Sequence, residues 1–269
     1  MLPQLHSALA DPGAGRCSTT VSVAAPWLRP YVVGYGGYRA GAADRPGPLR
    51  RRMFPMTLTT VLLDVDPAVR LVTGARHTGV LHDGPPWRVG VSVGLTPAGV
   101  RTLLGPDVRE LAGETVPLEA VAPLAGLADR LAELPDWSAR VAALDAEFTA
   151  RLRAVRTPPD RIVDRAWLRL QRPAGRAPIG ALAAELGVSR RYLELEFRRR
   201  IGLSPKTVAR VARLQRALAA LAGPEATLGA ATAVGYADQS HLSRETRALV
   251  DATPGELFAF VQDTVRAAP

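Results

Sequence analysis

The sequence is poor in cysteine and in lysine. Cys17 is the only cysteine among the 269 residues, which excludes an intramolecular disulfide and fits a reducing compartment. Lys206 is the only lysine, so arginine supplies nearly all of the 34 basic side chains. Because a GC-rich coding sequence produces the same arginine bias, the net charge of +9 by itself says little about nucleic acid.

The sequence also lacks long apolar runs and a basic N-terminal leader. No run approaches the roughly 18 apolar residues that suggest a membrane span, and the first basic residue is Arg16, unlike the start of a signal peptide. We therefore expect a cytoplasmic protein without a membrane partner. The length of 269 residues is enough for two domains, each with its own core. Hydrophobic residues make up 47% of the chain, which indicates a globular rather than a disordered protein.

The first part of the chain is patterned mainly as strands. Residues 57–65 and 69–73 are rich in β-branched side chains, and apolar residues alternate with glycine or serine over 89–95. Residues 1–20 look irregular. The pattern leaves the fold of this part open between a cupin-like barrel and another α+β sheet. Loops are expected at the Pro/Gly-rich stretches 41–48 and 84–86.

Helices follow these strands. Thr96–Gly105 predicts a short helix with Thr96 as its N-cap and Gly105 as its end, and longer helices are expected at 121–133 and 138–155. The last of these carries an apolar stripe that packs either within the chain or on a partner helix in a homodimer. The stripe consists of Val141, Leu144, Phe148, Leu152 and Val155.

Two prolines within Thr157–Asp160 break the chain, and we place a domain boundary there. The prediction is an α+β protein, with a β-rich effector or dimerisation domain at 21–156 and an all-α domain at 157–269. The all-α domain has 17 basic and 11 acidic side chains, against 17 and 14 in residues 1–156, as phosphate binding favours. Its helices are expected at 160–171, 179–186, 189–201, 205–221, 227–234, 238–250 and 254–265.

One unit occurs twice in the helical domain. Ala183 and Gly187 recur 48 residues later as Ala231 and Gly235. The alanine lets two helices approach closely, and the glycine ends the first helix and permits a positive φ in the turn. This arrangement predicts two helix-turn-helix units, each with a second, recognition helix that enters a major groove. Leu193, Arg198, Ile201, Ser204 and Pro205 recur 49 residues later as Leu242, Arg247, Val250, Thr253 and Pro254.

Three motifs within these units are Gly187–Leu193, Gly202–Pro205 and Gly235–Arg244. They resemble the signature of the AraC/XylS family of transcription regulators, over about residues 160–260. Residues 53–125 also resemble the N-terminal effector half of some members. The resemblance implies a transcription regulator that binds double-stranded DNA, is nucleoid-associated when bound, is not an enzyme and uses no cofactor. RNA polymerase and a small-molecule effector are further candidate partners.

The resemblance also assigns roles to individual residues. Arginine can pair with guanine, glutamine with adenine, and glutamate can accept from cytosine. The base-reading candidates are Arg191, Glu194, Leu195, Gln239, Ser240 and Arg244. The phosphate-binding candidates, which position the protein without reading sequence, are Ser189, Arg190, Arg198 and Arg247.

Three residues depart from the family pattern. Leu195 stands where the first recognition helix usually has arginine, so a base contact is lost or becomes an apolar contact with a thymine methyl group. Thr246 replaces a core aromatic residue that corresponds to Phe197, and Asp251 replaces a glycine. The second unit is therefore expected to be packed less well than the first.

An enzyme is the alternative function. Residues 90–94 satisfy the G-x-S-x-G pattern of a serine hydrolase, with Ser92 as the nucleophile. However, the strand pattern continues past the serine, and the only later histidine is His241, within the second recognition helix. His77, His82 and Asp83 offer three metal ligands without a fourth, so we expect no metal site.

The N-terminal domain contains most of the aromatic residues of an aromatic-poor chain. Aromatic side chains can line a pocket for a small molecule, although core packing explains them equally. The candidates for an effector pocket are Trp27, Tyr35, Tyr38, Phe54 and Trp87.

Overall fold

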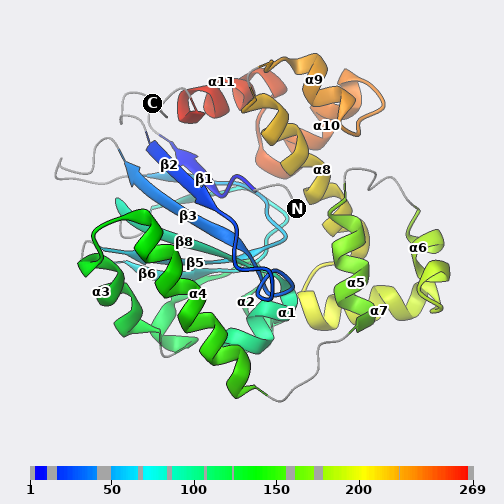
Figure 1. Ribbon diagram of the computed structural model, residues 1–269. Helices are drawn as coiled ribbons and strands as arrows, with labels where there is room; N and C mark the ends of the chain where they lie inside the picture. Colours follow the sequence, from blue (N-terminus) through cyan, green and yellow to red (C-terminus); the bar gives the residue numbers. More distant parts are fainter. Residues whose placement is uncertain are drawn as a thin grey trace.

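The structure, a computed structural model, combines a β-rich N-terminal part with a helical C-terminal part, as expected (Figure 1). The loops expected at 41–48 and 84–86 and the boundary at 157–160 lie outside the described residues. Among the described helices, none is both long enough and apolar enough to cross a membrane. The described residues are 4–10, 17–40, 50–65, 69–83, 87–105, 108–122, 124–155, 161–172, 178–223 and 225–265.

The larger sheet is antiparallel, and in the described part of the chain its strands lie in the order β2-β3-β8-β5-β6-β9. The strands expected around 57–65, 69–73 and 89–95 are its centre. Alternation in the last of these places Val91 and Val93 in the core with no exposure to solvent. The strands are β2 (Cys17–Ser22), β3 (Val32–Ala40), β5 (Thr59–Asp64), β6 (Arg70–Thr73), β8 (Val89–Leu95) and β9 (Thr115–Pro117).

A second sheet contains the N-terminal strand β1 (Ser7–Leu9), which pairs with β4 (Arg51–Met53), and β4 in turn pairs with β7 (Val80–His82). The expectation that residues 1–20 are irregular is therefore wrong for the described ones. Cys17 is likewise buried at the start of β2. Pairing with distant strands orders this segment, and a local sequence pattern does not reveal such pairing.

The helix expected after β8 is present, with an irregular turn. Thr96 caps α1 (Pro97–Gly99) by accepting a hydrogen bond from the Gly99 amide at 3.0 Å. The chain continues as the π-helical segment η1 (Val100–Leu104) and ends at Gly105, whose φ is 100°. The other helical segments of this part are α2 (Val108–Leu111), η2 (Leu118–Ala120), α3 (Ala125–Glu133) and α4 (Trp137–Ala154).

The apolar stripe of α4 packs within the chain. Leu144 and Phe148 have no solvent exposure, and the Phe148 ring stacks on Tyr35 at a centroid distance of 6.4 Å. The Tyr35 hydroxyl donates to the Asp145 carboxylate at 2.7 Å. Figure 1 shows α3 and α4, in green, lying over one face of the larger sheet. The stripe therefore does not offer the face that the homodimer alternative requires.

The C-terminal helices begin and end within two residues of the expected positions. Their local signals are strong, because serine, threonine or aspartate caps most N-termini and glycine follows α7. They are α5 (Arg161–Leu170), α6 (Ile179–Glu185), α7 (Arg190–Ile201), α8 (Pro205–Leu221), α9 (Leu228–Ala233), α10 (Gln239–Val250) and α11 (Pro254–Val265).

The two parts of the chain share hydrophobic cores. One core lies within the N-terminal part, but the expectation of a separate core for each domain fails elsewhere. Met56, Leu58 and Ala75 pack with α5, α6, α7 and α8, and Ala8 and Phe54 pack with α8 to α11. The helical part is therefore built against the strands that precede it.

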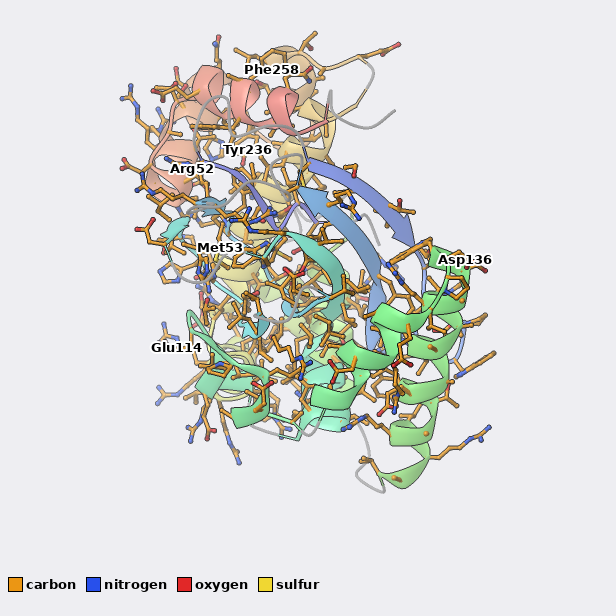
Figure 2. The ribbon with its side chains drawn as sticks, turned by 90° about the vertical axis from the view of Figure 1, so that its left-hand side faces the viewer. Arg52, Met53, Glu114, Asp136, Tyr236 and Phe258 are labelled. Carbon is orange, nitrogen blue, oxygen red and sulfur yellow. The ribbon has the colours of Figure 1, made fainter. Side chains whose placement is uncertain are left out.

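The N-terminal part also contacts the C-terminal ends of α7 and α10. The Gly79 amide donates to the Leu249 carbonyl of α10 at 2.6 Å, and Arg52 donates to the Val250 carbonyl at 3.3 Å. At the end of α7, a Cβ on Gly202 would lie 2.4 Å from that of Ala112, beyond α2. Figure 2 places Arg52 beside the C-terminal helices and Asp136, the N-cap of α4, on the opposite side of the molecule.

Gln215 joins the N-terminal segment to α8. Its side chain is 4% exposed. The amide oxygen accepts from the Leu5 amide at 2.8 Å, and the amide nitrogen donates to the carbonyls of Leu5 at 3.1 Å and Pro55 at 2.7 Å. A single buried side chain thus satisfies three backbone groups from two separate segments.

Replacing Gln215→Ala should lower the free energy of unfolding by about 2–4 kcal/mol, because three hydrogen bonds are lost and buried backbone groups lose their partners. Urea denaturation of the full chain measures this change. The exposed Gln239→Ala is the matched control and should change stability by less than about 0.5 kcal/mol. Equal midpoints for Gln215→Ala and the unaltered protein would contradict the role of this residue.

Asp251 ends α10 in the left-handed conformation, with φ 51° and ψ 44°. Among the described residues it is the only one other than glycine with a positive φ. Gly202 ends α7 in the same way, with φ 79°. A side chain disfavours this conformation, and a carboxylate is also unfavourable at the negative end of a helix dipole.

Asp251→Gly should raise the free energy of unfolding by about 0.5–1 kcal/mol. Thermal unfolding of the full chain tests this. Asp251→Asn keeps a side chain of the same size and removes the charge, so it should stabilise less than glycine does. Asp251→Ala should be no more stable than the unaltered protein. The prediction is contradicted if Asp251→Ala unfolds at a higher temperature than Asp251→Gly.

Candidate nucleic-acid interface

The first unit positions α7 through a close helix contact, a glycine turn and an N-cap. Ala183 of α6 is 1% exposed, so the two helices meet closely there. Gly187 has φ 70°, which a glycine adopts without strain. Ser189 then caps α7, because its hydroxyl accepts from the Tyr192 amide at 3.1 Å.

The second unit repeats this arrangement. Ala231 of α9 has no solvent exposure, and Gly235 in the turn has φ 147°. Asp238 caps α10 by accepting from the His241 amide at 2.6 Å. The repeat seen in the sequence is therefore a repeat of structure.

The buried faces of α7 and α10 correspond at an offset of 49 residues. Leu193, Phe197 and Ile201 are fully buried, and their counterparts are Leu242, Thr246 and Val250. Thr246 is also fully buried, and its hydroxyl bonds to the Ser243 carbonyl at 3.2 Å. The buried hydroxyl of Thr246 therefore has a hydrogen-bond partner within its own helix.

The exposed face of α7 carries the three candidates predicted for it. Arg191 is exposed and, in the described part of the chain, has no ion-pair or hydrogen-bond partner. Glu194 pairs with Arg190 at 2.9 Å, one helical turn away. Leu195 is 58% exposed, so its side chain lies outside the core and can make an apolar contact with a partner.

The exposed face of α10 carries Gln239, Ser240 and Arg244, and all three are exposed. At the offset of 49 residues, Ser240 corresponds to Arg191 and Arg244 to Leu195. The arginine thus lies in the first turn of one helix and in the second turn of the other. The two exposed faces have the same geometry and different chemistry.

The phosphate candidates separate into two groups. Ser189 and Arg190 lie at the N-terminus of α7. Arg198 and Arg247 are exposed in the last turns of α7 and α10. Each lies about 12 Å beyond the first residue of its helix, at 1.5 Å per residue, towards the end that contacts the N-terminal part.

The structure does not bring the five aromatic candidates for an effector pocket together. Tyr35 belongs to the core beneath α4, Phe54 to the core beneath α11, and Tyr38 and Trp87 to a third cluster. Trp27 is 59% exposed, and its indole nitrogen donates to Thr149 at 2.9 Å. A pocket built from all five is not formed.

The hydrolase and metal candidates have other partners. Ser92 lies within β8 and donates to the Gly36 carbonyl at 3.1 Å, so no helix begins at the serine as a nucleophile elbow requires. Asp83 pairs with Arg50 at 2.8 Å, and the His82 ring packs on Trp87. Among the described residues there is no group of three metal-ligating side chains.

The structure adds basic residues on α8 that the sequence interpretation missed. Lys206, Arg210 and Arg213 are spaced as i, i+4 and i+7, so they share one face of the helix. That spacing is visible in the sequence, but none of the residues predicted to bind DNA lies on this helix. Next to them, burial and the Glu245 carboxylate raise the pKa of Tyr236, so the phenol stays protonated.

Residues 182–259 match the family model of a helix-turn-helix domain. No curated protein matches the chain. Two solved structures of ToxT from Vibrio cholerae are similar to it: one has 13% identity and a TM-score of 0.45, covering 91% of this chain and 98% of that chain. The other has 12% identity and a TM-score of 0.44, covering 95% and 96%.

The segment that matches the family model begins within α6 and ends within α11, so it contains both units. Residues 182–259 are a DNA-binding helix-turn-helix domain of the AraC type.

Proposed function

We propose that this protein regulates transcription by binding a specific DNA site, with α7 and α10 in adjacent segments of the major groove. The observation that carries the proposal is the pair of equivalent exposed faces on two helices joined by one rigid connection. The connecting helix α8 has 17 residues, a length of roughly 25 Å. That length suits two readers placed about one DNA turn, or 34 Å, apart.

The base-reading roles follow from exposure and chemistry. Arg191 and Arg244 have long exposed side chains that can each bind guanine through two hydrogen bonds. Gln239 suits adenine, and the exposed Leu195 suits a thymine methyl group. Glu194 can contact cytosine only after its ion pair with Arg190 breaks. The free energy needed to break this pair makes its base contact less favourable than those of the two arginines.

We assign the N-terminal residues 21–156 the modulating role, through a ligand or through dimerisation, and residues 157–269 the DNA-binding role. Support comes from the contacts of Gly79 and Arg52 with the end of α10. A ligand that favours one arrangement of these contacts would shift the population of DNA-binding conformations. A serine hydrolase is not proposed, because Ser92 lacks the required turn.

Arg191→Ala and Arg244→Ala should each relax sequence preference at different base positions. Losing a two-bond arginine contact with guanine should cost about 1–3 kcal/mol of discrimination at one position. Selection of bound sequences from a random DNA library by the full chain, followed by sequencing, measures this directly. The two variants should affect base positions roughly one DNA turn apart.

Arg130→Ala is the matched control. Its side chain is 60% exposed and pairs with Glu147, but it lies on α3 in the N-terminal part. The control should keep the selected sequence unchanged. If both Arg191→Ala and Arg244→Ala also select the unaltered sequence, the recognition assignment is wrong.

A further inference from the structure

A cleft of about 600 Å³ lies between the two helix-turn-helix units. Its floor is the basic face of α8, with Lys206, Arg210 and Arg213. One wall contains Arg190 at the start of α7, and the other contains His241 and Glu245 of α10. The cleft therefore separates the two helices to which base reading is assigned.

The cleft keeps a positive charge after the ion pairs of its lining residues are counted. Arg190 is paired with Glu194 of its own helix. Four cationic side chains line it, with Glu245 as the only carboxylate among its lining residues. Glu245 holds Arg210 through both of its oxygens, at 3.1 and 3.0 Å. Lys206 is exposed and has no hydrogen-bond or ion-pair partner in the described part of the chain. The remaining charge suits an anion.

Two of the side chains are held in place before any ligand arrives. The Arg213 guanidinium lies 5.7 Å from the centre of the Tyr236 ring. The stem of Arg213 also packs against Gly235, where a Cβ would come within 3.1 Å of the arginine Cγ. His241 packs edge-on against the same ring at 5.3 Å. Ordered side chains lose less entropy on binding, which favours affinity.

We propose that this cleft binds the sugar–phosphate backbone of DNA between the two major-groove segments. When two helices on one side of a duplex enter adjacent segments, the backbone must cross the space between them. In this protein the crossing backbone would meet Lys206 and Arg213, with Arg190 on the α7 side. The proposal rests on the proposed function and adds a phosphate-binding role for α8.

If the cleft neutralises DNA phosphates, the affinity for DNA should depend on salt concentration. Each phosphate contact contributes about −0.9 to the slope of log K against log salt. Lys206→Ala and Arg213→Ala in the full chain should each reduce the magnitude of the slope by about 1 and weaken binding about 8-fold at 0.1 M salt. The loss should be similar for specific and unrelated duplexes, because phosphates carry no sequence information.

Arg130→Ala is again the control, since it lies on α3 outside the cleft, and it should leave the slope unchanged. Failure of the phosphate proposal is distinct from failure of the proposed function. If Lys206→Ala and Arg213→Ala retain affinity and slope while the protein still selects one sequence, the cleft proposal alone is overturned. If the protein selects no DNA sequence, both fall.

The single lysine permits a second, independent measurement. Reductive methylation of the unaltered full chain modifies the Lys206 amine, and mass spectrometry of the peptide that contains it gives the extent. A selected duplex should protect Lys206 strongly, and an equal phosphate concentration as inorganic phosphate should not. Protection by inorganic phosphate alone indicates a small-anion site and overturns the proposal, as does methylation that is undiminished on bound DNA.

Discussion

The burial of α8 is the constraint on which the rest of the structure depends. Leu214, Ala217 and Leu218 have no solvent exposure, because helices from one side and N-terminal strands from the other cover this helix. Gln215 then fixes its position by bonding to Leu5 and Pro55. Apolar burial supplies stabilisation without direction, whereas hydrogen bonds to two backbone segments specify one arrangement. The two units attached to the ends of α8 inherit that arrangement.

The N-terminal part holds the two recognition helices at corresponding points. Gly202 and Asp251 are the equivalent end residues of α7 and α10. Gly202 lies against Ala112 of the N-terminal part. Asp251 follows Val250, whose carbonyl accepts a hydrogen bond from Arg52. The first turns of the helices, which carry Arg191 and Ser240, remain exposed. The ends that face the strands are thus separate from the ends assigned to DNA. The spacing of α7 and α10 and the conformation of the N-terminal part are linked through these contacts.

Much of the helical part could be predicted from the sequence, because its signals are local. Ser189, Ser204 and Asp238 accept hydrogen bonds from amides three residues later, so each helix start is encoded in four consecutive residues. The pairing of Ser7 with Met53 could not be predicted, because it joins distant segments through backbone groups that every residue possesses. The shared cores could not be predicted for a related reason. The sequence shows that an apolar face must be buried, but it does not show which other element covers that face.

The missed cleft shows how one helix serves two purposes at once. The face of α8 with Leu214 and Leu218 supports the cores, and the face with Lys206, Arg210 and Arg213 lies between the units. Glu245 reaches across from α10 to pair with Arg210, which ties the second unit to the connecting helix. That pair neutralises one arginine, so charge in the cleft is concentrated on the exposed Lys206 and on Arg213, which the turn residues Gly235 and Tyr236 support. The turn between α9 and α10 therefore also positions a cation between α7 and α10.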